Sequence, residues 1–255
     1  MKLANKRVLI TRPRAQADEF AAALIAEGAQ TIFFPVIEII PPDDFSELDR
    51  ALQNLDQYDW LILTSIHGVD AFFKRLEFLG MKELPSQIRV AAVGSKTAQS
   101  LITLGTFPDH VPDEFVAEGI LSGIKKDISG KKFLLLQSNL ARKVLSDQVR
   151  SAGGFVDDIV AYHNIASQPR ASELDDLRFG IDIITFTSPS TVKNFVDIVC
   201  KNRLDPLNLP GNPLFACIGP ITKKAAEEAG LTNLVVANEY TTAGLIQVLG
   251  NLVYS

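Results

Sequence analysis

The chain has 255 residues, of which 47% are apolar and 22% are charged, and this composition is typical of an ordinary globular protein with one large core or two smaller ones. Its formal net charge is -5 and it has no basic run beyond two or three residues, which argues against a nucleic-acid partner. Two cysteines in apolar surroundings do not form a disulfide framework, and no apolar run approaches the ~18 residues of a membrane span. The N-terminus lacks a secretory apolar region, so we expect a cytoplasmic protein with no membrane attachment.

Apolar strand patterns alternate with helical patterns along the whole chain. The expected strands are 8–11, 31–34, 60–63, 89–93, 132–136, 155–160, 183–187, 214–218 and 234–236. The expected helices are 15–27, 45–54, 69–79, 96–104, 116–124, 141–152, 193–200, 221–229 and 242 to the C-terminus. Residues 36–40 and 161–166 look like extended connectors. This alternation predicts an α/β fold with parallel sheets flanked by helices.

The two halves of the chain repeat one another. Residues 182–192 have a strand, a polar elbow and the start of a helix, and 59–69 have the same plan 123 residues earlier (182 minus 59). Gly94 and Gly219 are 125 residues apart (219 minus 94), as are Val8 and Phe133 (133 minus 8). We therefore predict an internal duplication. The symmetry permits either two tandem domains or two domains that exchange segments between the halves.

The elbows between strands and helices are rich in hydroxyls and glycines. They are Thr11-Arg12, Thr64-Ser65, Gly94-Ser95, Ser138-Asn139, Thr187-Ser188 and Gly219-Pro220. In parallel sheets such elbows lie at the carboxyl ends of strands, where free helix amides favour anions. Any single hydroxyl could simply cap its helix, but the whole set predicts an anion-binding cleft.

Other chemistries lack their motifs. No GxGxxG follows a strand, and there is no GxxxxGK[ST] or GxSxG, which argues against nucleotide-dependent enzymes and hydrolases. The three histidines share no metal-ligand spacing. Tyr162 lies in the second connector, 125 residues after Ile37 (162 minus 37). It could shield a sheet edge or point at a bound ligand, whereas the neighbouring His163 is expected to be structural.

Seven segments in order and spacing, rather than any one motif, carry a family resemblance. They are 8–13, 34–38, 64–69, 93–98, 160–162, 186–190 and 218–222. Together they resemble the uroporphyrinogen-III synthase family of the haem pathway. The resemblance implies the exchanged arrangement, with one domain of 1–36 plus 168–255, a second of 39–163, and connectors at about 35–40 and 161–168.

The resemblance also implies the chemistry. The substrate would be hydroxymethylbilane, a linear tetrapyrrole with many carboxylates, which the enzyme would dehydrate and cyclise with inversion of its D ring. It implies no metal and no organic cofactor. A transient contact with the preceding pathway enzyme is a further expectation, and a monomer is the default assumption.

The family's site residues transfer to this chain position by position. Tyr162 would be catalytic, and substrate would bind to Arg12, Ser65, Thr97, Ser138, Arg142, Thr187, Ser188, Thr222 and Thr241. Three positions depart from the family pattern. Gln137-Ser138 replaces a frequent Arg-Gly, Ile66-His67 replaces a Pro-basic pair, and Ile221 stands where some members carry Thr.

Two other functions compete with this one. A non-catalytic two-domain protein that closes on a small polyanionic ligand would share the fold and the hinge. A nucleotide-dependent oxidoreductase is disfavoured by the missing glycines. Tyr162 together with the elbow hydroxyls favours the enzyme.

Overall fold

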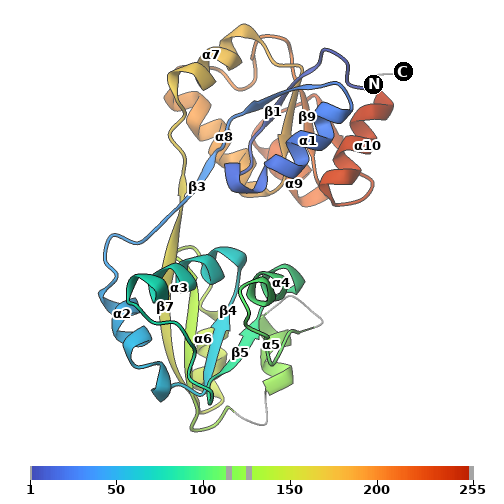
Figure 1. The fold of residues 1–255 in the computed structure, drawn as a ribbon. Helices are drawn as coiled ribbons and strands as arrows, with labels where there is room; N and C mark the ends of the chain where they lie inside the picture. Colours follow the sequence, from blue (N-terminus) through green and yellow to red (C-terminus); the bar gives the residue numbers. More distant parts are fainter. Residues whose placement is uncertain (1, 113–116, 125–127, 253–255) are drawn as a thin grey trace. The chain divides into compact units, whose positions relative to one another are not determined.

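The computed structural model describes residues 2–112, 117–124 and 128–252, and the chain forms two compact units (Figure 1). The first unit comprises Met1–Glu38 and Ile165–Ser255, and the second comprises Ile39–Asn164. The first unit is thus built from both ends of the chain and the second from its middle. The chain passes from one unit to the other within strand β3 (Ile37–Ile40) and within strand β7 (Phe155–Ala166).

The first unit has a five-stranded parallel sheet with the order β10-β9-β8-β1-β2. Its strands are β1 (Arg7–Ile10), β2 (Gln30–Phe33), β8 (Ile183–Phe186), β9 (Leu214–Cys217) and β10 (Leu234–Val236). Its α-helices are α1 (Asp18–Ala26), α7 (Ala171–Phe179), α8 (Pro189–Lys201), α9 (Pro220–Glu228) and α10 (Thr242–Leu252).

The second unit has a sheet with the order β3-β7-β6-β4-β5, in which β7, β6, β4 and β5 are parallel. Besides β3 and β7, its strands are β4 (Trp60–Leu63), β5 (Arg89–Ala92) and β6 (Lys132–Ser138). Its α-helices are α2 (Ser46–Gln53), α3 (Ile66–Phe78), α4 (Ser95–Thr103), α5 (Ala117–Ile124) and α6 (Val144–Ser151). The predicted α/β class, with parallel sheets flanked by helices, is confirmed.

The two sheets have the same topology. Strands β9-β8-β1-β2 of the first unit occur in the same order as β5-β4-β6-β7 of the second. Strands β1 and β6 start 125 residues apart (132 minus 7), as do β5 and β9 (214 minus 89). Even the isolated bridge between Ala91 and His110 recurs 125 residues later, as the pairing of Ala216 with Val235. Each sheet therefore joins the first βαβ segment of one half of the chain to the rest of the other half.

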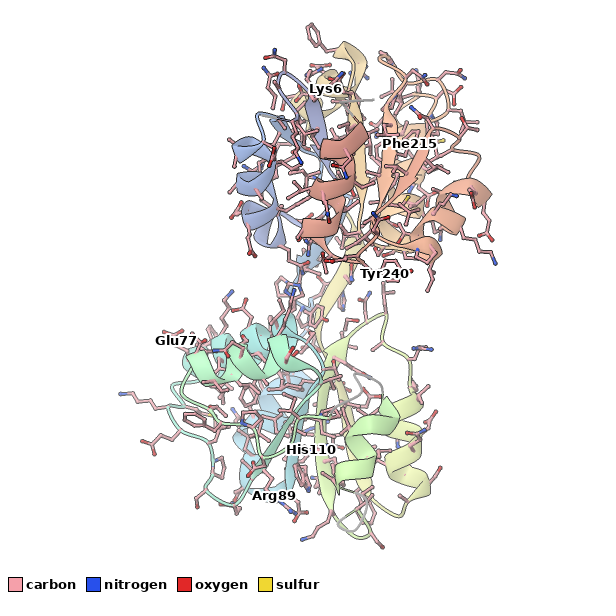
Figure 2. All side chains as sticks on the ribbon, turned by 90° about the vertical axis from the view of Figure 1, so that its right-hand side faces the viewer. Lys6, Glu77, Arg89, His110, Phe215 and Tyr240 are labelled. Carbon is pink, nitrogen blue, oxygen red and sulfur yellow. The ribbon has the colours of Figure 1, made fainter. Side chains whose placement is uncertain are left out.

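Side-chain alternation divides the core of the second unit into two layers. All four residues of β4 are buried. Leu61 and Leu63 belong to the cluster that includes residues of α2 and α3, while Trp60 and Ile62 belong to the cluster that includes residues of α5 and α6. Because successive strand residues point to opposite faces, one strand supports both layers. The guanidinium of Arg89 lies 4.3 Å from the centre of the Trp60 ring, near the end of the sheet (Figure 2).

Several element bounds differ from the sequence-based prediction. The helix expected at 15–27 is a 3₁₀ turn (Arg14–Gln16) followed by the shorter α1, and α3 begins three residues before the expected 69. The start of the helix expected at 116–124 and the last residues of the chain lie outside the described ranges. The strand at 155–160 and the connector at 161–166 form the single strand β7, because its backbone stays extended through both segments.

Candidate active site

In the second unit, the predicted site residues follow the carboxyl ends of the parallel strands. Ser65 follows β4 and caps α3, where its Oγ accepts the Gly68 amide at 3.0 Å. Thr97 lies in the first turn of α4 and is only 4% exposed. Ser138 ends β6, and Arg142 is exposed in the loop that follows. The elbows therefore lie where parallel strands end, as anion binding requires.

Tyr162 contacts residues from several segments at this edge of the sheet. It lies in β7, with 8% of its surface exposed, and its hydroxyl is 2.9 Å from the Ser65 Oγ. The ring of His67, in the first turn of α3, meets the Tyr162 ring edge-on, with the centroids 5.6 Å apart. The backbone carbonyl of Tyr162 accepts the Asn139 amide at 3.2 Å. The phenol is thus fixed on several sides before any ligand arrives.

A cavity of about 390 Å³ opens beside Tyr162, wholly within the second unit. One wall is a face of α3, whose residues recur at helical spacing: His67, Asp70, Ala71, Lys74, Arg75 and Phe78. The opposite side comprises Ile39 to Pro41, Phe45 and the Ala161–Tyr162 segment of β7. The cavity thus combines a polar end at Tyr162 with largely apolar walls, which is the usual character of a small-molecule site.

Burial changes the titration of two groups on the sheet edges. Burial lowers the pKa of His67 below its ordinary value of 6.5, and Asp70 opposes that shift. The imidazole beside Tyr162 is therefore mainly neutral at pH 7. Burial also lowers the pKa of Arg12, against the attraction of Glu19, but the guanidinium remains a cation because its ordinary pKa is 12.5.

In the first unit, the predicted residues occupy the corresponding edge. Arg12 follows β1, half-buried, and Thr187 follows β8. Ser188 caps α8. Thr222 lies in the first turn of α9 and is 3% exposed, and the Thr241 Oγ1 accepts the Gly244 amide at 3.0 Å at the start of α10. Each of these residues therefore lies near a strand end or a helix start.

Of the predicted residues, Ser65 and Tyr162 are joined directly through their side chains in the described part of the chain. Ser138 is the register partner of Tyr162 across a bulge between β6 and β7, so it is a backbone neighbour. Thr97 and Thr222 are nearly covered, which limits their hydroxyls as ligand donors. Arg142 does not line the cavity beside Tyr162.

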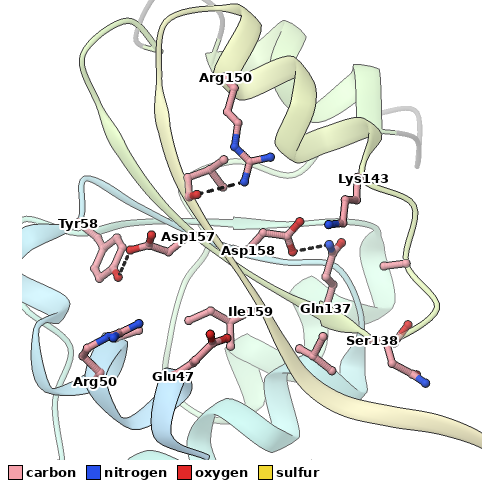
Figure 3. A pocket seen from close by; sticks show the side chains of 15 residues that line it. Glu47, Arg50, Tyr58, Gln137, Ser138, Lys143, Arg150, Asp157, Asp158 and Ile159 are labelled. Carbon is pink, nitrogen blue, oxygen red and sulfur yellow. Dashed lines mark hydrogen bonds between the residues drawn. The ribbon is translucent and has the colours of Figure 1, made fainter.

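A second cavity of about 340 Å³ lies along the same strand, away from Tyr162 (Figure 3). Two pairs of its polar side chains bond each other. Tyr58 donates to Asp157 at 2.5 Å and Gln137 donates to Asp158 at 2.5 Å. Burial and the Asp157 carboxylate raise the pKa of Tyr58. Tyr162, the predicted catalytic residue, does not line this cavity, so we place the candidate active site at Tyr162 instead.

Within the described ranges, no three or more His, Cys, Asp or Glu side chains gather as metal ligands would. Among the helices of those same residues, none is long and apolar enough to cross a membrane.

The sequence analysis missed the role of α3 as a wall of this site. From the sequence, His67 is only a departure from the family pattern and one of three histidines without metal-ligand spacing, and no signal singles out Ala71. The helical spacing of 67, 70, 71, 74, 75 and 78 was visible in the sequence, but the pattern does not reveal that β7 lies opposite.

Comparisons with known proteins agree with this geometry. A family model described as uroporphyrinogen-III synthase HemD matches residues 18–247. A uroporphyrinogen-III synthase from Synechococcus elongatus is 34% identical over 248 residues, covering 96% of this chain and 94% of that protein. The enzyme of the same name from Chlorobaculum parvum is 31% identical over 232 residues, covering 89% of this chain and 90% of that protein.

Solved structures support the fold. Uroporphyrinogen-III synthetase from Helicobacter pylori aligns with a TM-score of 0.63 at 18% identity, covering 97% of this chain and 99% of that one. A mutant of the Thermus thermophilus enzyme aligns with a TM-score of 0.61 at 18% identity, covering 98% and 99%. The family model and these relatives, which match most of the sequence, show that this chain belongs to the uroporphyrinogen-III synthase family.

Proposed function

We propose that this protein converts hydroxymethylbilane into uroporphyrinogen III, eliminating water, inverting the D ring and closing the macrocycle. The observation that carries the assignment to this site is the Tyr162 phenol, fixed 2.9 Å from the Ser65 hydroxyl beside a cavity. A binding protein would need no such fixed proton donor.

In the proposed mechanism, Tyr162 assists loss of the hydroxyl group. Hydroxide is a poor leaving group, so the carbon–oxygen bond breaks more easily when the departing oxygen receives a proton or a strong hydrogen bond. The pyrrole nitrogen supplies the electron pair that replaces this bond, and the oxygen leaves as water. A phenol can donate at neutral pH without being charged. Ser65 orients the phenol and can donate to its oxygen as negative charge develops there.

The substituted carbon of the D ring then attacks the carbon that lost the oxygen, forming a spiro intermediate. The bond between that D-ring carbon and its original bridging carbon then breaks, and the bridging carbon bonds to the unsubstituted α-carbon of the D ring, which inverts the ring and closes the macrocycle. That α-carbon loses its proton, which replaces the one that Tyr162 gave to the departing oxygen. Positioning supplies much of the acceleration, because holding the two ends of the bilane together replaces an improbable encounter.

The carboxylates of the substrate need hydrogen-bond donors and cationic partners. We propose that they interact with Arg12, Ser65, Ser138, Arg142, Thr187, Ser188 and Thr241, and with the first turns that contain Thr97 and Thr222. Hydroxyls and helix amides can bind a polyanion in a protein of net charge -5, because local dipoles rather than total charge define the site.

We further propose that the two compact units are the two domains of the enzyme, that an ancestral half-chain was duplicated, and that the protein works in the cytoplasm. A bilane that cyclises without an enzyme would favour a transient contact with the enzyme that supplies it. Co-sedimentation of the two enzymes with bilane present, compared with each alone, tests that contact.

The product tests the function. Purified protein is incubated with hydroxymethylbilane, and the isomers are separated after oxidation to porphyrins. Type III product above a no-enzyme control supports the proposal. Tight bilane binding with only the spontaneous type I product would indicate the non-catalytic binding protein instead.

A further inference from the structure

Ala71 of α3 is a small residue in the lining of the cavity beside Tyr162, together with Ala161 and Tyr162 of β7. We expect a larger side chain at position 71 to reduce the open space. The internal repeat allows position 71 to be compared with its counterpart in the first unit.

Helices α3 and α8 correspond residue by residue, since both bounds differ by 123 (189 minus 66 and 201 minus 78). Ala71 therefore corresponds to Asn194. The Nδ2 atom of Asn194 donates to the carbonyl of Val36 at 3.2 Å. Val36 precedes Ala161 by 125 residues (161 minus 36) and so corresponds to it. In the first unit, a hydrogen bond therefore joins the connector to α8 at the positions that correspond to the lining of the cavity in the second unit.

We propose that this cavity is the pocket for one terminal pyrrole ring of the substrate, the ring that carries the departing hydroxyl. The proposal rests on the function proposed above and adds the location of that ring. A volume of about 390 Å³ is near the lower end of pockets that hold small molecules, which span about 300–1,000 Å³. It suits one ring with its two carboxylate chains better than the whole tetrapyrrole.

The lining of the cavity includes a fixed cluster of two aromatic rings and one guanidinium. Phe45 and Phe78 flank the Arg75 guanidinium at 4.0 and 4.1 Å, and Asp49 holds that guanidinium through two hydrogen bonds. This fixed aromatic and guanidinium surface suits a flat electron-rich ring. Ile39 adds a further apolar contact.

Lys74, which also lines the cavity, can bind a carboxylate chain of the substrate. Lys74 is 73% exposed in its side chain and pairs with Asp70 at 2.8 Å across one helical turn. Such an exposed pair is weak, so a substrate carboxylate can take the place of Asp70. Tyr162 lines the same cavity, and its hydroxyl, 2.9 Å from the Ser65 Oγ, would donate to the oxygen that leaves the same ring.

The test uses a monopyrrole that carries one acetate and one propionate chain. NMR titration of the full chain follows the signals of His67 and of the α3 amides. We expect saturable shifts with wild type. In Ala71→Asn, which places the residue of the first unit in the second, we expect binding to be roughly tenfold weaker.

A second variant tests the pocket even if Ala71→Asn fails to fold. Phe78 is 72% exposed, so Phe78→Asp leaves the core intact while it removes an aromatic wall and adds a repelling charge. It too should weaken binding of the monopyrrole. Asn194→Ala and Ala141→Asn, the latter in the second cavity, are the matched controls and should bind like wild type.

With the bilane, Ala71→Asn should raise KM by roughly tenfold while the product remains the type III isomer. No binding of the monopyrrole by wild type, or equal binding by wild type and both variants, overturns the pocket. Monopyrrole binding that Ala71→Asn weakens, in a protein that makes no type III isomer, supports the pocket and overturns only the proposed reaction.

Discussion

The elbow before α3 and the elbow before α8 share one backbone plan and use it differently. Ser65 and Ser188 have nearly the same φ and ψ (-161° and 162°, against -165° and 161°), and each Oγ accepts an amide three residues later. At Ser188 the partner Thr191 returns a bond, accepting the Ser188 amide at 3.2 Å. At Ser65 the partner is Gly68, which has no side chain that could accept a bond from the Ser65 amide. The Ser65 Oγ is instead hydrogen-bonded to the Tyr162 hydroxyl.

This comparison shows how two units with corresponding elbows can use the same serine in different ways. In the first unit the elbow is closed by local bonds, including one of 2.9 Å between the hydroxyls of Ser188 and Ser190. In the second unit the same hydroxyl bonds a residue 97 positions away. The position of Tyr162 is occupied by Ile37 in the first half, so the repeat contains no second phenol.

The largest expected effect comes from removing the phenol oxygen. Tyr162→Phe keeps the ring and its packing, and losing one transition-state donor typically costs about 10²–10³ in rate. We expect a folded variant whose turnover falls at least roughly tenfold and whose residual enzymatic product is still type III. Initial rates and the isomer ratio, each against a no-enzyme control, measure this.

Tyr58→Phe is the matched control, because Tyr58 is also a buried tyrosine whose hydroxyl bonds a neighbour, Asp157. It should change stability but not turnover. If Tyr162→Phe turns over at nearly the wild-type rate, the proton-donor role is wrong and Tyr162 is only a packing residue.

The two serine caps give the next effect. Ser65→Ala and Ser188→Ala each lose a helix cap, which costs about 0.5–2 kcal/mol of unfolding free energy. Only Ser65→Ala also releases Tyr162, so we expect it alone to lower kcat, while Ser188→Ala acts mainly on KM. Denaturant unfolding and steady-state kinetics on both variants separate these contributions. An equal fall in kcat would remove the distinction between the elbows.

Replacing either of the corresponding threonines, Thr97 or Thr222, should give a smaller effect. Thr97 and Thr222 occupy the third position of α4 and of α9 and are 125 residues apart (222 minus 97). Replacing either by Val keeps the shape and removes one hydroxyl, which is worth about 0.5–1.5 kcal/mol in binding if it contacts substrate. Calorimetric titration with the product measures this. Unchanged affinity together with a lower melting temperature would make both residues structural.

The smallest effect concerns pH. Because burial lowers the pKa of His67 in the folded state, the unfolded chain binds a proton more readily, and stability falls as the pH drops below about 6.5. His67→Gln should flatten this part of the curve of melting temperature against pH. The low-pH loss below about 3.8, from Asp49, Asp59 and Asp182, should persist because their lowered pKa values do not involve His67. Identical curves for both proteins would exclude His67 as the cause.

The sequence by itself determined the local order of the molecule. Apolar periodicity gave the alternation of strands and helices, and the offset of 125 residues related the halves, since both are properties of short segments. Hydroxyls after strands located the elbows and with them Ser65, whereas Tyr162 was singled out by its place in a connector and by the family resemblance.

Only the tertiary structure decided which segments lie beside each other. Tandem and exchanged arrangements have the same local patterns, and strand pairing between distant segments selects one of them. The bond from Ser65 to Tyr162, the ring of His67 beside that phenol and the cavity that Ala71 helps to line all depend on α3 packing against β7. Such contacts join residues about a hundred positions apart, and their geometry comes from the packing of the whole sheet rather than from the propensity of either segment.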